Sequence, residues 1–535
     1  MLTGPPDEHD PSALGGPPSG GNLIDWLVDQ QTVAPPAPTA NEPPKDQAPT
    51  AFRPAADPQA LHARFLEEAN PLRALLLWAW QYPTVPRSAA QLCRRISRDI
   101  ARLDALLSDQ VNRILHHPAF QQLEASWRGL RYLVETVPES EAGIKVRLLN
   151  ISWRELTRDL ERASEFDQSQ LFQKIYSDEF GMPGGEPYGL LLGDYDVCPF
   201  PSAKRPLDDV GTLRQLAAVA AASFAPMILA ANPAMFGLDD FSGLEQPLDF
   251  RQTFSQAEYT KWNGLRDSDD VRFLGLMLPR VLMRRPYADD GSRSDGFRFA
   301  EDVRGRDASK FLWGNAVYAF GAVVLRSFAN YGWVADLRGA RDEEDGAGRV
   351  GGLTFDWFAT DRAGIALKSP TDVMVSDRQE QELSELGFIP LCYSKDTTDC
   401  VLYSASSIQR FKTYDQELAT TNSRLSAMLH YMLCVSRFAH YVKVLGRDKV
   451  GGFKTADDCQ RFLNRWLLQY VLTDDTAGPE TRARHPLREA SVQVRESVGK
   501  PGGFDCTIHL RPHFQLEQLS TAIKLTTELT RPRGT

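Results

Sequence analysis

The sequence predicts an α/β fold (mixed α+β), in which helices and strands share one core. A disordered Pro-rich tail precedes this core, and a β-rich segment follows it at the C-terminus. Apolar residues recur every three or four positions over long stretches, which is typical of helices, and alternate with polar residues over shorter ones, which is typical of strands. The two patterns alternate through the middle of the chain, and this favours an α/β core. The composition is that of a globular protein, with 42% hydrophobic and 24% charged residues in 535.

Residues 1–58 form the predicted tail. Thirteen of the 35 prolines fall in the first 60 residues, and such a segment buries too little apolar surface to offset the entropy lost on ordering. An apolar island at residues 22–30 interrupts the tail. Its apolar members are Leu23, Ile24, Trp26, Leu27 and Val28.

The island is expected to form a short amphipathic helix, because Leu23, Trp26 and Leu27 stand at i, i+3 and i+4. A lone helix of this length is marginal in water. Two interpretations follow. The island is either a docking peptide for a partner's groove or a helix that packs back on the chain's own core.

Three further regions follow the tail. Residues 59–140 are expected to be helical, with one helix beginning at Pro118, and residues 141–400 to form the α/β core. Residues 401–485 are again expected to be helical. The core elements predicted by periodicity are strands at 144–151 and 188–194 and helices at 152–163, 168–179, 210–231 and 310–331, and a long helix is predicted at 413–445.

The last region, residues 486–535, is predicted to contain a β-hairpin. Residues 491–498 and 505–510 alternate in polarity, and a Gly- and Pro-rich turn at 499–503 separates them. A hairpin offers strand edges to which other chains can add a strand. The residues expected to mark these linking strands are Val492, Val494, Thr507 and His509.

Charge and composition exclude several classes of protein. A formal net charge of −10 argues against a general nucleic-acid binder. No apolar run is long enough for a membrane span. The N-terminus has neither the basic nor the apolar region of a secretory signal, so a cytoplasmic location is expected. The seven cysteines are scattered without a CxxC, which indicates reduced thiols.

No catalytic or cofactor motif emerges. The glycines at 446–452 lack the Lys and Ser/Thr of a phosphate-binding loop. Cys506, His509 and His513 do not share one strand face, so a metal site is not expected. The acid pair Asp194 and Asp196 and the pair Cys392 and His430 have no surrounding signature of chemistry. The sequence therefore predicts a protein that is not an enzyme and has no cofactor.

Several long blocks of the sequence are similar to one family, the large sheath subunit of bacterial type VI secretion systems (TssC/VipB/EvpB). The similarity runs in order from about residue 60 to 530, and the tail and an acidic loop at 342–348 depart from it. The blocks that carry it are residues 117–134, 152–195, 273–282, 312–320, 385–391, 434–441 and 510–517.

The resemblance implies a contractile tail-sheath-like core and a structural role. Such subunits pair with a small sheath subunit (TssB/VipA-like), polymerise with copies of themselves around an inner tube of Hcp, attach to a baseplate and contract to propel the tube. A ClpV-type ATPase disassembles the contracted sheath, and the tail island stands where the family displays a helix to it. The alternative is a phage-like contractile tail sheath or baseplate component.

Overall fold

The computed structural model describes residues 58–513, with gaps at 81–87, 138–142, 183, 204, 290, 292–295, 305–306, 341–345, 359–366, 396, 449–454, 475 and 497–503. Within this part the chain forms two compact units. The first comprises the described residues up to Asn112 and Ala288–Ala300, and the second comprises Arg113–Tyr287 and the chain from Glu301 onward.

The helices are α2 (Pro58–Glu67), α3 (Pro71–Trp80), α4 (Ala89–Leu115), α5 (Pro118–Glu135), α6 (Trp153–Arg162), α7 (Gln170–Phe172), α8 (Asp209–Ser223), α9 (Phe250–Phe254), α10 (Thr260–Arg266), α11 (Val317–Tyr331), α12 (Asp377–Glu385), α13 (Glu417–Ser426), α14 (Leu429–Asp448), α15 (Ala456–Leu468) and α16 (Pro479–Arg484). The strands are β1 (Leu191–Val197), β2 (Met227–Ala231), β3 (Leu274–Leu278), β4 (Val281–Leu282), β5 (Trp313–Gly314), β6 (Arg349–Val350), β7 (Phe388–Pro390), β8 (Cys392–Tyr393), β9 (Cys400–Val401), β10 (Leu487–Glu496) and β11 (Phe504–Pro512).

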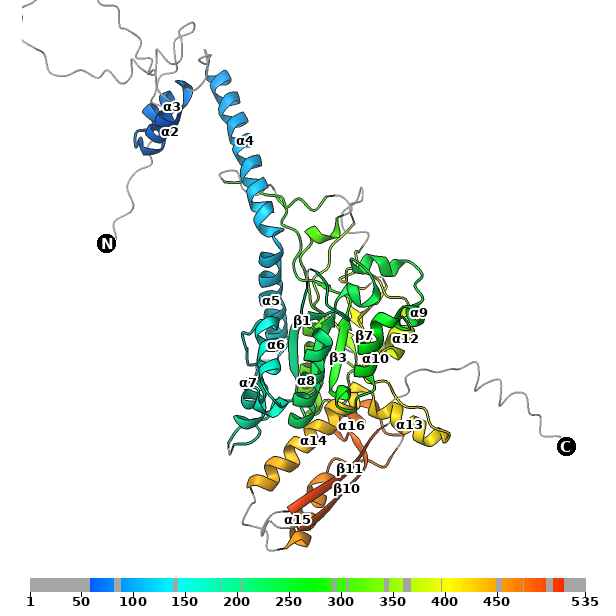
Figure 1. Ribbon diagram of the computed structural model, residues 1–535. Helices are drawn as coiled ribbons and strands as arrows, with labels where there is room; N and C mark the ends of the chain where they lie inside the picture. Colours follow the sequence, from blue (N-terminus) through cyan, green and yellow to red (C-terminus); the bar gives the residue numbers. More distant parts are fainter. Residues whose placement is uncertain are drawn as a thin grey trace, which may run out of the picture. The chain divides into compact units, whose positions relative to one another are not determined.

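A parallel sheet of order β1-β2-β3-β7 forms the centre of the second unit (Figure 1). Strands β2 and β3 are buried along their whole length, because helices cover both faces, which is usual for parallel sheets. Leu229 and Leu276 point to the face covered by α8 and α10. Ile228 and Met277 point to the face covered by α5 and α11. Alternate residues thus feed two apolar cores, which makes a three-layer α/β arrangement.

The first unit contains α2, α3 and most of α4. Helices α2 and α3 pack against each other, and Leu76 and Ala79 are buried there. The indole Nε1 of Trp78 donates a hydrogen bond to Asp99 Oδ2 of α4 at 3.1 Å. None of the α4 side chains is buried.

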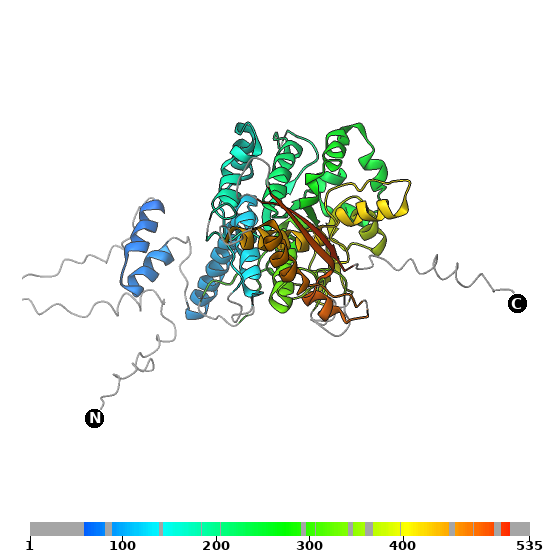
Figure 2. The same ribbon diagram turned by 90° about the horizontal axis from the view of Figure 1, so that it is seen from below.

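The β10–β11 hairpin belongs to the second unit and packs with α14 and α15 (Figure 2). An aromatic cluster anchors these two helices. Trp333 stacks on Phe438 with ring centroids 4.0 Å apart, and Tyr470 meets Trp333 edge to face at 4.7 Å. Val492 and Val494 of β10 continue this apolar core. The hairpin is therefore held on the unit by one buried face.

The mixed α/β fold predicted from the sequence is confirmed, and so are the helix beginning at Pro118, the helix at 152–163 and the C-terminal hairpin. The helix predicted at 210–231 is wrong beyond Ser223. Phe224 adopts a left-handed conformation that ends α8, and Pro226 precedes strand β2. The long helix predicted at 413–445 is divided into α13 and α14, because Met428 forms a β-bridge with Ser406 between them.

Two other predicted elements need correction. The helix at 310–331 begins only at Val317. The helix predicted at 168–179 is confirmed over residues 170–177, where the short α7 continues directly into a π-helix at Gln173–Ser177. Residues 144–151 were expected to be a strand but pair with no other strand in the described chain. Among the described helices, none combines the length and apolar character needed to cross a membrane.

Candidate assembly sites

The two strands of the hairpin have different outer edges. They pair in antiparallel register, with Val492 opposite Ile508 and Val494 opposite Cys506. On the β10 side, the side chains of α15 occupy the edge. Asn464 accepts from the Val492 N–H at 2.8 Å and donates to the Val492 carbonyl at 3.2 Å, and Gln460 accepts from the Val494 N–H at 3.0 Å.

The β11 edge is open. In an antiparallel ladder, two residues directly opposite each other either both direct their N–H and C=O groups toward the partner strand or both direct them away from it. Because Val492 and Val494 point outward to α15, their partners Ile508 and Cys506 point outward on the other side. The backbone groups of these two residues have no further hydrogen-bond partner within the described chain. Of the two hairpin strands, as far as the structure describes them, only β11 therefore presents an edge to which another strand can add.

The structure separates the four linking residues predicted from the sequence. Val492 and Val494 are buried against α15, and their backbone edge is already satisfied. Thr507 and His509 lie on the solvent face of β11. Sequence reasoning missed Asn464 and Gln460. In the sequence, Gln460 and Asn464 are two amide side chains four residues apart, next to the apolar face of α15. Polar residues are common at such positions, so the pair does not stand out before the hairpin is seen beside it.

Helix α5 carries a second candidate surface. Ala125, Gly129 and Leu133 are buried, and Gly129 and Leu133 lie against α11. The other side of the helix bears large apolar residues that are exposed, at spacings of three, four and seven residues. These residues are Phe120, Leu123, Trp127 and Val134.

Helix α4 has a similar stripe within the first unit. Ile100, Leu103 and Leu107 are 52%, 59% and 45% exposed. A soluble protein rarely exposes rows of large apolar residues unless another chain covers them. The stripes of α4 and α5 are therefore each suited to contact a partner.

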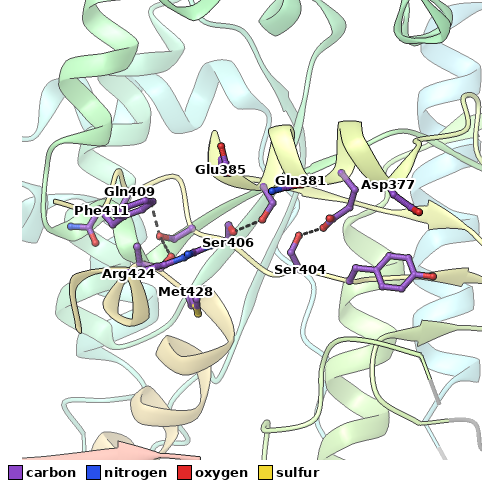
Figure 3. Close-up of a pocket in the computed structure, with 15 residues that line it drawn as sticks. Asp377, Gln381, Glu385, Ser404, Ser406, Gln409, Phe411, Arg424 and Met428 are labelled. Carbon is purple, nitrogen blue, oxygen red and sulfur yellow. Dashed lines mark hydrogen bonds between the residues drawn. The ribbon is translucent and has the colours of Figure 1, made fainter. Parts of the chain in front are cut away.

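A polar pocket of about 330 Å³ lies along α12 (Figure 3). Asp377 and Gln381 of α12 face the segment that carries Ser404 and Ser406. Ser404 donates to the buried carboxylate of Glu380 at 2.5 Å. The residues that line the pocket include no histidine, so the serine hydroxyls lack the usual general base. The pocket offers hydrogen-bonding groups for contact with a polar chain.

The acidic pair predicted from the sequence has separate partners. Asp194 accepts hydrogen bonds from Ser126, Asn315 and Tyr318. Asp196 accepts from Asn232 at 2.8 Å. The Asp194 carboxylate thus joins β1 to α5 and α11, which is a structural role.

The other candidate groups are buried and poorly suited to chemistry. Burial, with Glu380 and Asp377 nearby, raises the pKa of Cys392 to about 12, so the thiolate is disfavoured. Burial also lowers the pKa of His430 well below its usual value, and Arg338 adds to this. Within the described ranges no group of three His, Cys, Asp or Glu residues converges to hold a metal ion. The tail residues Leu23, Ile24, Trp26, Leu27 and Val28 lie outside the described residues.

Comparison with known proteins gives a consistent result. Residues 97–409 match a family model described as EvpB/VC_A0108, tail sheath N-terminal domain, and residues 418–529 match its tail sheath gpW/gp25-like domain. A curated relative, the type VI secretion system sheath protein TssC1 of Pseudomonas aeruginosa, is 42% identical over 439 residues, covering 82% of this chain and 86% of the relative.

Two solved structures show weaker likeness. The baseplate of the anti-feeding prophage aligns at 9% identity with a TM-score of 0.34, covering 71% of this chain and 82% of that one. The contracted helical sheath of the same particle aligns at 13% identity with a TM-score of 0.28, covering 59% and 75%. With TM-scores below 0.5, neither alignment establishes a shared fold.

Proposed function

The chain belongs to the EvpB/VC_A0108 family of type VI secretion tail sheath proteins and is a structural sheath subunit, and from this premise we propose how it assembles and with which partners. It pairs with a small sheath subunit of the TssB/VipA type, and the pairs polymerise in the cytoplasm as a helical tube around an Hcp inner tube on a baseplate. Contraction of the tube propels the inner tube. In this role the chain needs no catalytic activity.

The open edge of β11 is the observation that carries the proposal. A strand from a neighbouring subunit can add to it through main-chain hydrogen bonds, which tolerate wide sequence variation. The β10 edge is blocked by Asn464 and Gln460, so addition has one direction only. Such a link would keep neighbours joined while the subunit bodies move between two packed lattice states.

The exposed stripes of α4 and α5 support the pairing with the small subunit. Each stripe needs an apolar cover, and an amphipathic helix laid along it would bury residues such as Leu103 on α4 or Trp127 on α5. The tail island around Trp26 serves a later step. Displayed on a Pro-rich tail, it would dock in a ClpV-type ATPase that disassembles contracted sheaths.

The assembly experiment targets the open edge. Cys506→Pro removes an outward-pointing N–H without removing a bond of the β10–β11 ladder. Cys506→Ala is the matched control, since it keeps the N–H. Both variants are co-expressed with the small sheath subunit, and heterodimers are scored by co-purification and tubes by electron microscopy.

We expect both variants to form heterodimers and only Cys506→Ala to form long tubes. Tubes of normal length with Cys506→Pro would show that β11 does not link subunits. If the unaltered chain forms no tubes with its small subunit under conditions where the pair is soluble, the proposed assembly itself is wrong.

A further inference from the structure

Residues 144–151 contain no helix, turn or bend and alternate in polarity, but no strand of the described chain lies beside them. In the described chain, none of the backbone N–H and C=O groups of residues 145–150 has a hydrogen-bond partner. We propose that this segment is an incomplete strand that pairs with a strand of the small sheath subunit. The inference rests on the proposed function and adds a specific pairing site to it.

One face of the segment is fixed to the body of the protein. Lys145 forms an ion pair with Glu186 at 2.5 Å, and Arg147 forms one with Glu179. At the end of the segment, the Tyr195 hydroxyl donates to the Ile151 carbonyl at 2.5 Å. These contacts come from side chains and from one terminal carbonyl, so they leave the N–H and C=O groups of residues 145–150 unused.

The opposite face is apolar, and two of its three side chains are exposed. Ile144, Val146 and Leu148 share it, because side chains alternate along an extended chain. Val146 is 42% and Leu148 is 66% exposed. An extended apolar segment with unpaired backbone groups is a template for strand addition, and native proteins normally cover such an edge. The occupant must therefore supply both main-chain groups and apolar side chains, which an added strand does.

A second copy of this segment is a poor occupant. The segment carries Lys145 and Arg147 and no acidic residue. Antiparallel pairing of two copies centred on Val146 or Arg147 would place like charges opposite each other, which is destabilising. The helical stripes of α4 and α5 are also unsuited, because a helix has no backbone groups to offer. A strand from a different chain, the small sheath subunit, fits these constraints.

Two proline variants test which edge of the segment is used. Successive residues of a strand direct their N–H groups to opposite edges, so Val146→Pro and Leu149→Pro each block a different one. Neither removes an internal hydrogen bond, because both N–H groups are unpaired in the described chain. Val146→Thr and Leu149→Thr are matched controls that keep the N–H and a strand-compatible side chain.

Each variant is co-expressed with the small sheath subunit, and amide hydrogen exchange is measured across residues 144–151 in the purified heterodimer. We expect one proline variant to lose co-purification and the other three variants to retain it. We also expect exchange of the segment's amides in the unaltered heterodimer to be slower by about tenfold or more than in an exposed chain.

Three results would overturn the inference and leave the sheath function standing. The first is unprotected amides in a heterodimer that still forms tubes. The second is protection that arises only in the tube, which would assign the segment to a neighbouring subunit in the lattice. The third is protection in this chain without the small subunit, which would assign it to another part of the same chain.

Discussion

Four titratable side chains near the start of α5 form a buried cluster. Arg284 donates to Glu301 at 2.5 and 3.2 Å and to Glu124 at 2.8 Å, and His116 lies 3.4 Å from Glu301. The side chains of Arg284 and Glu301 are 6% and 2% exposed. Arg284→Met would leave buried carboxylates without their cation, so we expect a loss of about 3–5 kcal/mol in the free energy of unfolding.

Urea unfolding of the co-purified heterodimer, followed by tryptophan fluorescence, measures this loss. Arg131→Met is the control, because Arg131 forms an exposed i, i+4 pair with Glu135, with side chains 74% and 60% exposed. Such pairs contribute under about 1 kcal/mol. Equal effects of the two substitutions would contradict a buried, energetically coupled cluster.

The same cluster predicts a pH dependence. Burial alone would raise the pKa of Glu301, but the hydrogen bonds from Arg284 and the Tyr287 N–H, with the charges of Arg284 and His116, outweigh burial and lower it. A carboxyl whose pKa is lower in the folded state stabilises the fold above its unfolded value, near 4.5, and loses this effect as the pH falls through the folded value.

We therefore expect the gap in unfolding free energy between the unaltered chain and Glu301→Gln to be constant near neutral pH and to shrink below about pH 4.5. Urea unfolding of the heterodimer at a series of pH values gives the gap. A gap that stays constant or widens on acidification would show that the ionised carboxylate is not what stabilises the cluster.

Gly129 of α5 allows close packing against α11. A Cβ at this position would overlap the ring of Tyr318, whose hydroxyl donates to Asp194 at 3.0 Å. Gly129→Ala should therefore cost about 1–3 kcal/mol of stability, as overpacking usually does. In α10, a Cβ at Gly264 would meet nothing within 4 Å, so Gly264→Ala should be neutral or stabilising by up to about 1 kcal/mol. Thermal unfolding of both variants compares them, and a harmless Gly129→Ala would refute the close approach.

At the scale of elements, the capped edge of β10 yields a graded prediction. Asn464 makes two hydrogen bonds to Val492, whereas Gln460 makes one to Val494. Removing a partner from a buried backbone group costs about 1–3 kcal/mol. We expect Asn464→Ala to destabilise the hairpin more than Gln460→Ala does, and amide exchange at Val492 to speed up only in the former. Equal exchange at Val492 in both variants would contradict this account.

Periodicity predicted elements well where turn or capping residues also marked their ends. The hairpin was predicted from alternation on both sides of a glycine-rich turn, and the helix at 118–135 from the spacing of its apolar residues together with Pro118. The helix predicted over 210–231 merged α8 with β2, because the apolar second half of α8 and the fully buried β2 read as one nearly continuous apolar run. Phe224 ends the helix in a left-handed conformation that the sequence pattern does not reveal.

The candidate assembly sites were only partly predictable. Alternation along β10 and β11 predicted two strands but not which edge is free, since that depends on where α15 packs. Residues 144–151 show the converse. Their alternation predicted a strand, but no strand of the described chain lies beside them. A strand pattern that finds no neighbouring strand in its own chain is what the proposed pairing with another chain would produce.

At the scale of the whole molecule, the proposed docking of the tail predicts that sheath recycling depends on the apolar island at residues 22–30. Leu23, Trp26 and Leu27 share one face of the expected helix at residues 22–30, with Ile24 and Val28 on its flank. Fully burying one such side chain contributes about 1.5–3 kcal/mol. Two or three anchors, less the entropy of ordering the helix, correspond to roughly micromolar affinity. That is sufficient in a polymer, where many tails can engage one ring-shaped partner.

We therefore expect a peptide of residues 18–34 to bind the N-terminal domain of the cognate ClpV-type ATPase in a fluorescence titration. Trp26→Ala with Leu27→Ala should abolish this binding, whereas Gln30→Ala with Gln31→Ala should preserve it. In the full chain, the first pair should leave sheath assembly intact while contracted sheaths persist in cells, because assembly uses other surfaces. Disassembly at the normal rate with the first pair would reject docking and favour a helix that packs back on its own core.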